Sequence, residues 1–174
     1  MTIEVRRARC DDADFLLELI TDEDTRPFLG GRAGETRDDV VAEIERSERE
    51  PDAFGWFVIE ADGARAGCVA FHRTNERHRT VEAGRFAIHP SFRGRGIGTE
   101  AARRFQRHLL VDLDFHRVEL QIYGFNERAI AHAEQCGYVR EGVKRKAYLK
   151  HGEWQDAVLF SLLQEELPDV SPDR

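Results

Sequence analysis

Hydrophobic positions in the first third of the chain follow two different spacings. Alternation over residues 3 to 9 predicts a first strand, and an apolar stripe at helical spacing from Asp11 to about residue 22 predicts a helix. Thr36, followed by Asp39 three positions later, is the start signal of a second helix. The segment from Thr25 to Gly31 has no period, so it is interpreted either as a plain connection or as a mobile lid over a binding site.

Three strand patterns occupy the middle of the chain. The runs from Phe54 to Ala61 and from Ala66 to Phe71 are rich in aromatic and β-branched residues, and Asp62-Gly63 between them is a hairpin signal. Residues Thr80 to His89 alternate their side chains between two faces, and the proline at position 90 ends the pattern. We therefore expect an antiparallel hairpin followed by a third strand.

A strand, a helix and a strand follow one another in the second half. The helix is predicted from about Gly96 to Asp112, because apolar residues recur there every four positions. Residues Arg117 to Tyr123 are the next strand, and a right-handed crossover of this kind makes its two strands parallel. Asn126 and Gly137 are the start and stop signals of a further short helix.

The end of the chain is predicted to be mostly strand. Tyr138 and Val139 begin one strand, and the runs from Arg145 to Leu149 and from Trp154 to Leu162 flank a turn at His151-Gly152. The length of 174 residues suits one domain with a sizeable core. We expect that domain to cover residues 1–167 and residues 168–174 to be a frayed tail.

Charge and cysteine content narrow the class of protein. The net charge of −7 argues against nucleic acid as the main partner. No apolar run approaches the roughly 20 residues that span a bilayer, so no membrane partner is expected. Cys10, Cys68 and Cys136 stand singly, without disulfide or metal-site spacing, which favours a reducing cytoplasm and no metal.

The strongest chemical signal lies between the third strand and the long helix. Residues Arg93 to Thr99 read Arg-Gly-Arg-Gly-Ile-Gly-Thr. The glycines let the backbone approach an anion, and the helix start offers unpaired N–H groups and the positive end of a dipole. The stretch is therefore interpreted as a phosphate cradle, with a bare connecting turn as the alternative.

Two common phosphate motifs fit this stretch poorly. A Walker A loop needs lysine and then serine or threonine after its last glycine, whereas Gly98 is followed by Thr99 and Glu100. The dinucleotide fingerprint needs its third glycine where Thr99 stands, and it normally opens a domain. A dinucleotide-binding oxidoreductase is thus a distant alternative.

Another pattern does fit. Arg93, Gly96 and Gly98, directly after Phe86-Ala87-Ile88, resemble the motif of the GNAT superfamily of acyl-CoA-dependent N-acyltransferases. The similarity continues through Asn126 and the Cys136-Gly137-Tyr138 helix end. Residues 141–162 of the chain are similar to the branch of the family that contains ribosomal-protein N-terminal (alanine or serine) acetyltransferases. The similarity to the family as a whole is strong over residues 80–165.

The resemblance implies a fold. It is a mixed α/β arrangement whose central sheet of about seven strands is mostly antiparallel, with one parallel central pair splayed around the cofactor. About four helices flank this sheet.

The resemblance also implies a donor and its binding residues. Acetyl-CoA would supply the acyl group without a metal, with its pyrophosphate on backbone N–H groups from about Gly94 to Thr99 and its pantetheine arm along the main chain of the preceding strand. The residues themselves leave open whether the acyl group is acetyl or longer. The expected cofactor-binding residues are Phe86, Ala87, Ile88, Arg93, Gly94, Arg95, Gly96, Ile97, Gly98, Thr99 and Asn126.

The catalytic groups are less well marked. Glu82 stands where some branches of the family carry a glutamate base, and its alternative is a strand carboxylate without a catalytic role. Many members carry a tyrosine as thiolate donor where this chain has Ala133. Tyr123, Tyr138 and Tyr148 are the remaining candidates, beside protonation by the leaving ammonium or by water.

The expected reaction is direct transfer to a primary amine in a ternary complex. The acceptor would be a protein N-terminus or a small-molecule amine, selected by residues 25–34, the second helix and residues 144–153. The alternative function is a module that senses acyl-CoA without transferring the acyl group, which the alanine at position 133 favours. Self-association into a homodimer through edge strands is compatible with such a sheet.

Overall fold

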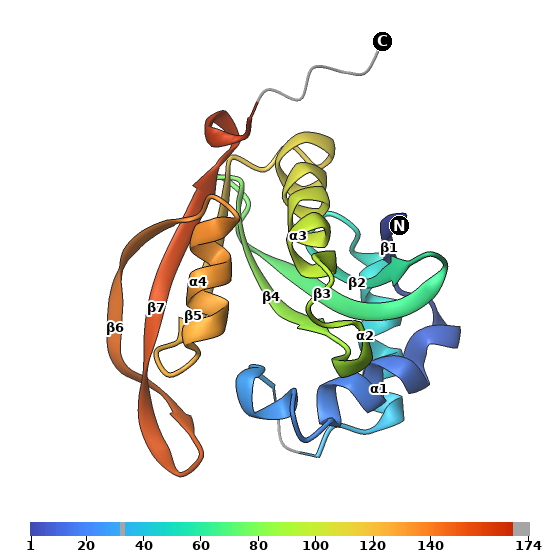
Figure 1. Cartoon of the computed structure of the whole chain (residues 1–174). Helices are drawn as coiled ribbons and strands as arrows, with labels where there is room; N and C mark the ends of the chain where they lie inside the picture. Colours follow the sequence, from blue (N-terminus) through green and yellow to red (C-terminus); the bar gives the residue numbers. More distant parts are fainter. Residues whose placement is uncertain (32–33, 169–174) are drawn as a thin grey trace.

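The computed structural model describes residues 1–31 and 34–168 (Figure 1). Within them, one sheet of seven strands has the order β1-β2-β3-β4-β5-β7-β6. Neighbouring strands are antiparallel except β4 and β5, which are parallel. The strands are β1 (Ile3–Arg7), β2 (Phe54–Ala61), β3 (Ala64–Asn75), β4 (Thr80–Ile88), β5 (Arg117–Tyr123), β6 (Val139–Lys150) and β7 (Glu153–Leu163). This arrangement confirms the predicted fold class.

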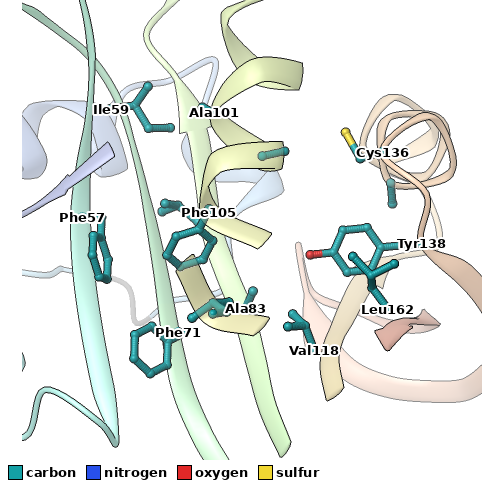
Figure 2. Packing of buried hydrophobic residues seen from close by; sticks show 14 of the residues in the cluster. Phe57, Ile59, Phe71, Ala83, Ala101, Phe105, Val118, Cys136, Tyr138 and Leu162 are labelled. Atoms are coloured by element: carbon teal, nitrogen blue, oxygen red, sulfur yellow. The ribbon is translucent and has the colours of Figure 1, made fainter. Parts of the chain in front are cut away.

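Helices cover both faces of the sheet. They are α1 (Ala13–Thr21), α2 (Arg37–Arg49), α3 (Ile97–Arg107) and α4 (Glu127–Gln135). Trp56 and Val58 of β2 pack in one core with α1 and α2, whereas Phe57 and Ile59 pack in the other with α3. Figure 2 shows this second core, where the rings of Phe57 and Phe105 meet edge to face with centroids 5.3 Å apart. Because successive strand residues point to opposite faces, one apolar run supplies two cores.

Local signals explain where the helices begin. The Thr36 hydroxyl accepts a hydrogen bond from the Asp39 amide, and the Asp39 carboxylate accepts one from the Thr36 amide at 2.9 Å. This capping box starts α2 as predicted. Asn126 caps α4 in a similar way, since its side-chain oxygen accepts from the Ala129 amide at 3.2 Å.

The parallel pair separates soon after it forms. Only three residue pairs join β4 to β5, from Thr80 with Arg117 to Glu82 with Glu119, and the strands then diverge (Figure 1). Beyond this point β4 carries a bulge against β3, where Arg85 has a φ of +50°. A non-glycine residue in this region costs about 1–2 kcal/mol. Ion pairs from Arg85 to Glu35 and Glu43 hold it there.

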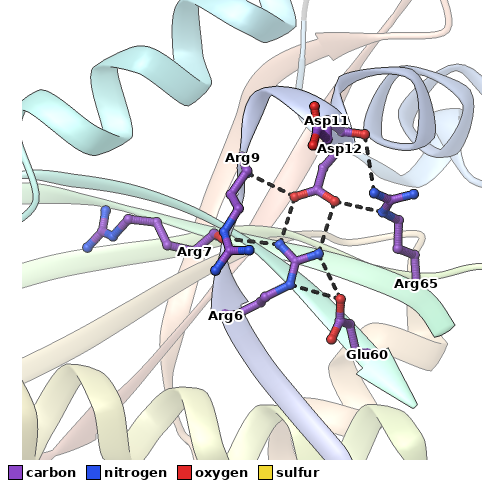
Figure 3. Close-up of polar contacts among 7 residues, drawn as sticks. All are labelled: Arg6, Arg7, Arg9, Asp11, Asp12, Glu60 and Arg65. Atoms are coloured by element: carbon purple, nitrogen blue, oxygen red, sulfur yellow. Dashed lines mark hydrogen bonds and ion pairs between the residues drawn. The ribbon is translucent and has the colours of Figure 1, made fainter. Parts of the chain in front are cut away.

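A buried carboxylate joins the first strand to the rest of the sheet. Asp12 is 1% exposed and accepts hydrogen bonds from Arg6 at 2.7 and 3.0 Å, from Arg65 at 2.7 Å and from the Arg9 amide at 2.9 Å (Figure 3). Burial would raise the pKa of Asp12, but these donors lower it to about 2. Arg6 of β1 also bonds Glu60 of β2, and Arg65 lies on β3, so the cluster ties three strands to the turn before α1.

Several boundaries differ from the sequence predictions. The first strand ends at Arg7, and a 3₁₀ turn at Cys10–Asp12 precedes α1. The long helix leaves α-geometry after Arg107 and ends in a π-helical turn at His108–Asp112. The strand expected to begin at Tyr138 and the strand expected over Arg145–Leu149 are one continuous strand, β6. Its pairing with β7 shifts near Gly142 and again before Tyr148. Of the predicted frayed tail, residues 169–174 lie outside the described residues, as do residues 32–33 of the segment expected to select the acceptor.

Candidate active site

The glycine-rich stretch connects the end of β4 to the start of α3. Gly94 and Gly96 have φ values of +75° and +76°, which other residues rarely adopt. Gly96 is the N-cap of α3, and its missing side chain leaves the first-turn amides without a side-chain cap. The main chain therefore presents N–H groups of a helix start to the adjacent cleft, as a cradle for a phosphate requires.

The two arginines of this stretch behave differently. The Arg93 guanidinium donates to the Ile88 carbonyl at 2.9 Å and to the Thr25 hydroxyl at 2.9 Å. It therefore fixes the stretch to β4 and to the segment after α1. Arg95 instead lies over the Phe92 ring, with its guanidinium carbon 5.6 Å from the centroid.

The predicted cofactor-binding residues gather around one cleft of about 290 Å³. Arg95 is the exception, since it does not line this cleft. The lining residues are Phe86, Ala87, Ile88, Arg93, Gly94, Gly96, Ile97, Gly98, Thr99 and Asn126. The cleft also includes Thr25 and Phe28 from the segment after α1. Whether these residues hold the cofactor stays a prediction, although their main chain has the geometry that a pyrophosphate needs.

A second cleft of about 580 Å³ opens where β4 and β5 diverge. It shares Phe28, Phe86, Asn126 and His132 with the first, so the two clefts adjoin. Glu82, predicted as the general base, lines the second cleft. The structure thus places this carboxylate beside the region that leads to the glycine-rich stretch.

Glu82 belongs to a hydrogen-bonded group that the sequence did not reveal. Gln121 of β5 donates its side-chain N–H to the Glu82 carboxylate. The Gln121 carbonyl oxygen accepts from the Lys144 ammonium at 3.0 Å and from the Tyr148 hydroxyl at 2.6 Å. Gln121 lies beside Glu82 because Glu82 pairs with Glu119, two residues earlier on β5. The residue pattern within one strand does not reveal such a pairing between strands.

The three tyrosine candidates are separated by their surroundings. Tyr138 is buried in the core, where burial raises its pKa (Figure 2). Tyr123 and Tyr148 line the second cleft, and burial raises the pKa of both. The negative charge of Glu82 raises the pKa of Tyr148 further. Ala133 is buried and offers no donor.

The segment after α1 forms one wall of both clefts. Its 3₁₀ turn, Arg26–Phe28, meets the tip of the β6–β7 hairpin. The Lys150 ammonium donates to the Leu29 carbonyl at 2.8 Å, and His151 Nε2 lies 3.2 Å from the Pro27 carbonyl oxygen. Phe28 and Leu29 line both clefts, so this segment is a wall that the hairpin tip contacts.

Neither a metal site nor a membrane span is found in the described residues. No group of three or more His, Cys, Asp or Glu side chains is arranged there to hold a metal ion. None of the helices within residues 1–31 and 34–168 combines the length and apolar character that a membrane crossing requires.

Comparisons with known proteins agree with this geometry. A family model described as "Acetyltransferase (GNAT) domain" matches residues 2–139. The Bacillus subtilis protein named "Putative ribosomal N-acetyltransferase YdaF" is 30% identical over 94% of this chain and 92% of its own length. The spermidine N(1)-acetyltransferase of Escherichia coli is 28% identical over 63% of this chain and 59% of its own length.

A solved structure shares the fold. Spermidine N-acetyltransferase from Vibrio cholerae, in complex with CoA and spermine, superposes with a TM-score of 0.85 at 23% identity, covering 95% of this chain and 97% of that one. The family match spans more than half of the chain, which decides against the dinucleotide-binding alternative. This chain therefore belongs to the GNAT acetyltransferase family, as an N-acetyltransferase that uses acetyl-CoA as its donor.

Proposed function

We propose that this chain transfers the acetyl group to a primary amine, either a protein N-terminus or a small-molecule amine, by direct attack in a ternary complex. The observation that carries the proposal is the position of Glu82. It lies at the last residue pair that joins β4 to β5 and lines the cleft that opens beyond it. A carboxylate at this point can take the proton of an amine that enters the cleft.

The donor would lie along β4. The first-turn amides of α3 and the left-handed Gly94 and Gly96 support a pyrophosphate at the glycine-rich stretch. A pantetheine arm that follows the main chain of Phe86–Ile88 away from this stretch runs toward Glu82, because both lie on the same strand. The thioester end would then face the second cleft.

The chemistry requires a neutral amine, because an ammonium has no free electron pair. Glu82 accepts one proton from the entering ammonium, the neutral nitrogen then bonds to the acetyl carbon, and the carbon–sulfur bond breaks to release the thiolate. A backbone N–H of Ala87 or Ile88 is the proposed donor to the oxyanion. The thiolate takes a proton from the new ammonium, from water, or from a neutral phenol at Tyr123 or Tyr148, which both line the cleft.

The finer acceptor class is proposed from the relatives. The Bacillus subtilis relative carries a ribosomal N-acetyltransferase name, which supports a protein N-terminus. The Escherichia coli relative is named for spermidine, which supports a small-molecule amine. Both names describe amine acetylation, and the first covers more of this chain.

The test is a thiol-release screen with acetyl-CoA as donor. The panel contains peptides with free and blocked N-termini, spermidine and an aminoglycoside. We expect release with at least one free amine and none with the blocked peptides. Acetyl-CoA binding by titration calorimetry without release from any amine would instead support the sensing module.

Location and assembly complete the proposal. We place the chain in the cytoplasm, which the three free cysteines of the described residues support.

We propose a homodimer through an edge of the sheet, supported by exposed Val139, Val143 and Leu149 on the edge strand β6. Light scattering after size exclusion should give a mass of two chains, and a single-chain mass at high concentration would refute the dimer.

A further inference from the structure

Gln121 bridges the proposed base and the hairpin side of the cleft. Its side-chain nitrogen donates to Glu82 of β4, and its side-chain oxygen accepts from Lys144 and Tyr148 of β6. Glu82, Gln121 and Tyr148 all line the second cleft. One amide thus joins three strands at the point where the central pair separates.

The neighbours of this amide determine which way it points. A lysine ammonium has only donors, and the Tyr148 hydroxyl donates here, so both require the amide oxygen. The remaining NH₂ group must then face Glu82, where it meets an acceptor when that carboxylate is ionised. The reversed amide would place its NH₂ group against the ammonium and its oxygen against the carboxylate. Lys144 and Tyr148 therefore select the orientation in which Gln121 donates to Glu82.

We infer that Gln121 is a positioning residue for acetyl transfer, which holds the Glu82 carboxylate aimed into the cleft. The inference rests on the proposed role of Glu82 as general base. Gln121 itself neither takes the amine proton nor contacts the donor in this scheme. It acts by donating one hydrogen bond that fixes the orientation of the Glu82 carboxylate.

Other charged groups lie around Glu82 on the neighbouring strands. His72 is its register partner on β3, and Glu119 is its partner on β5. Glu119 is itself paired with Arg117. The titratable and charged groups from the packed elements are His72 and Arg73 of β3, Arg117 and Glu119 of β5, and Lys144 and Tyr148 of β6. Within the part of the chain that the structure describes, the side-chain hydrogen bond to the Glu82 carboxylate comes from Gln121 and from none of these groups.

The test is the pH dependence of kcat/KM in the variant Gln121→Glu, with the amine that the screen identifies. This change keeps the size of the side chain and keeps a partner for Lys144, but it replaces the donor to Glu82 by a second negative charge. A like charge disfavours the ionised form of Glu82, so the acidic limb of the profile should move to higher pH by roughly one unit. Gln135→Glu, on the exposed end of α4, makes the same charge change away from the site and should leave the limb in place.

Calorimetry and two further variants separate the possible failures. Acetyl-CoA binding measured by calorimetry confirms that each variant is folded and keeps its donor site. If Gln121→Glu binds acetyl-CoA normally and keeps the wild-type acidic limb, the positioning role is refuted. If Glu82→Gln keeps wild-type turnover, the proposed base itself fails. Gln121→Leu, which removes the donor without adding charge, should lower kcat while the affinity for acetyl-CoA stays near wild type, and an unchanged kcat there also refutes the role.

Discussion

Asp12 shows how much one side chain can contribute to this fold. Its carboxylate is buried, and each oxygen accepts from an arginine on a different strand (Figure 3). A buried carboxylate without such donors would cost several kcal/mol. Here the donors lower its pKa to about 2, so the native state favours the ionised form more than the unfolded chain does.

This shift predicts an acid-dependent loss of stability. Because the pKa of Asp12 is lower in the folded state, its contribution of about 2 kcal/mol is present above pH 4 and is lost as the pH falls toward 2. Urea unfolding at pH 7 and pH 3 measures the loss. Asp12→Asn should be destabilised at pH 7 and should lose less stability on acidification than the wild type. The exposed Asp14→Asn is the control, and an equal acid response in all three proteins would contradict the prediction.

Substitution of Glu82 tests the proposed base at the same scale. Glu82→Gln should lower kcat at neutral pH by roughly 100-fold, because positioned general bases contribute about 10²–10⁴. Its dissociation constant for acetyl-CoA should stay within about twofold of wild type, since the side chain lies away from the glycine-rich stretch. Glu134→Gln, exposed on α4, provides the matched control for the loss of a carboxylate. Equal kcat values for wild type and Glu82→Gln would remove Glu82 from the mechanism.

At the scale of elements, the turn into α3 depends on backbone conformations that suit glycine. Gly96→Ala should strain the N-cap by about 1–2 kcal/mol and weaken acetyl-CoA binding, because the cradle amides move with it. Gly63→Ala is a close control, since Gly63 has a φ of +79° and open space around it in the β2–β3 turn. Both variants should lose similar stability in thermal unfolding, but only Gly96→Ala should lose affinity in calorimetry. Equal affinities would show that the cradle tolerates the change.

Elements with local signals were predicted well, and elements that depend on pairing were not. The start of α2 at Thr36, the start of α4 at Asn126 and the bounds of β5 followed from caps and alternation. The bulge at Arg85 and the continuous β6 depend on which strand lies beside them, so the pattern of one strand could not show them.

The candidate site divides in the same way. The glycine-rich stretch is a short motif, so its residues could be named from the sequence, and all but Arg95 line one cleft. Gln121 could not be named, because its relation to Glu82 arises from the parallel register and from two partners on β6. The roles of these residues stay predictions until the variants are measured.

At the scale of the whole molecule, donor binding should stabilise the native state. The predicted donor residues come from β4, the turn into α3, and Asn126 at the start of α4, so acetyl-CoA would contact both sides of the separation between β4 and β5. At 100 times its dissociation constant, it should add about 2.7 kcal/mol and raise Tm by roughly 5–10 °C. Differential scanning fluorimetry measures this shift, with NAD as the control ligand. A larger shift with NAD than with acetyl-CoA would contradict the donor assignment.

The contact between the hairpin tip and the turn at Arg26–Phe28 bears on how such a molecule can change its substrate. Lys150 and Leu29 lie 121 positions apart in the chain, yet the Lys150 ammonium donates to the Leu29 carbonyl, and Leu29 lines both clefts. The glycine-rich stretch depends on main-chain conformation, whereas this contact joins two side chains of the hairpin tip to a loop, a kind of region where substitutions are best tolerated. If the amine enters the second cleft as proposed, substitutions at this contact can change which amine is accepted while the residues proposed for the donor stay unchanged.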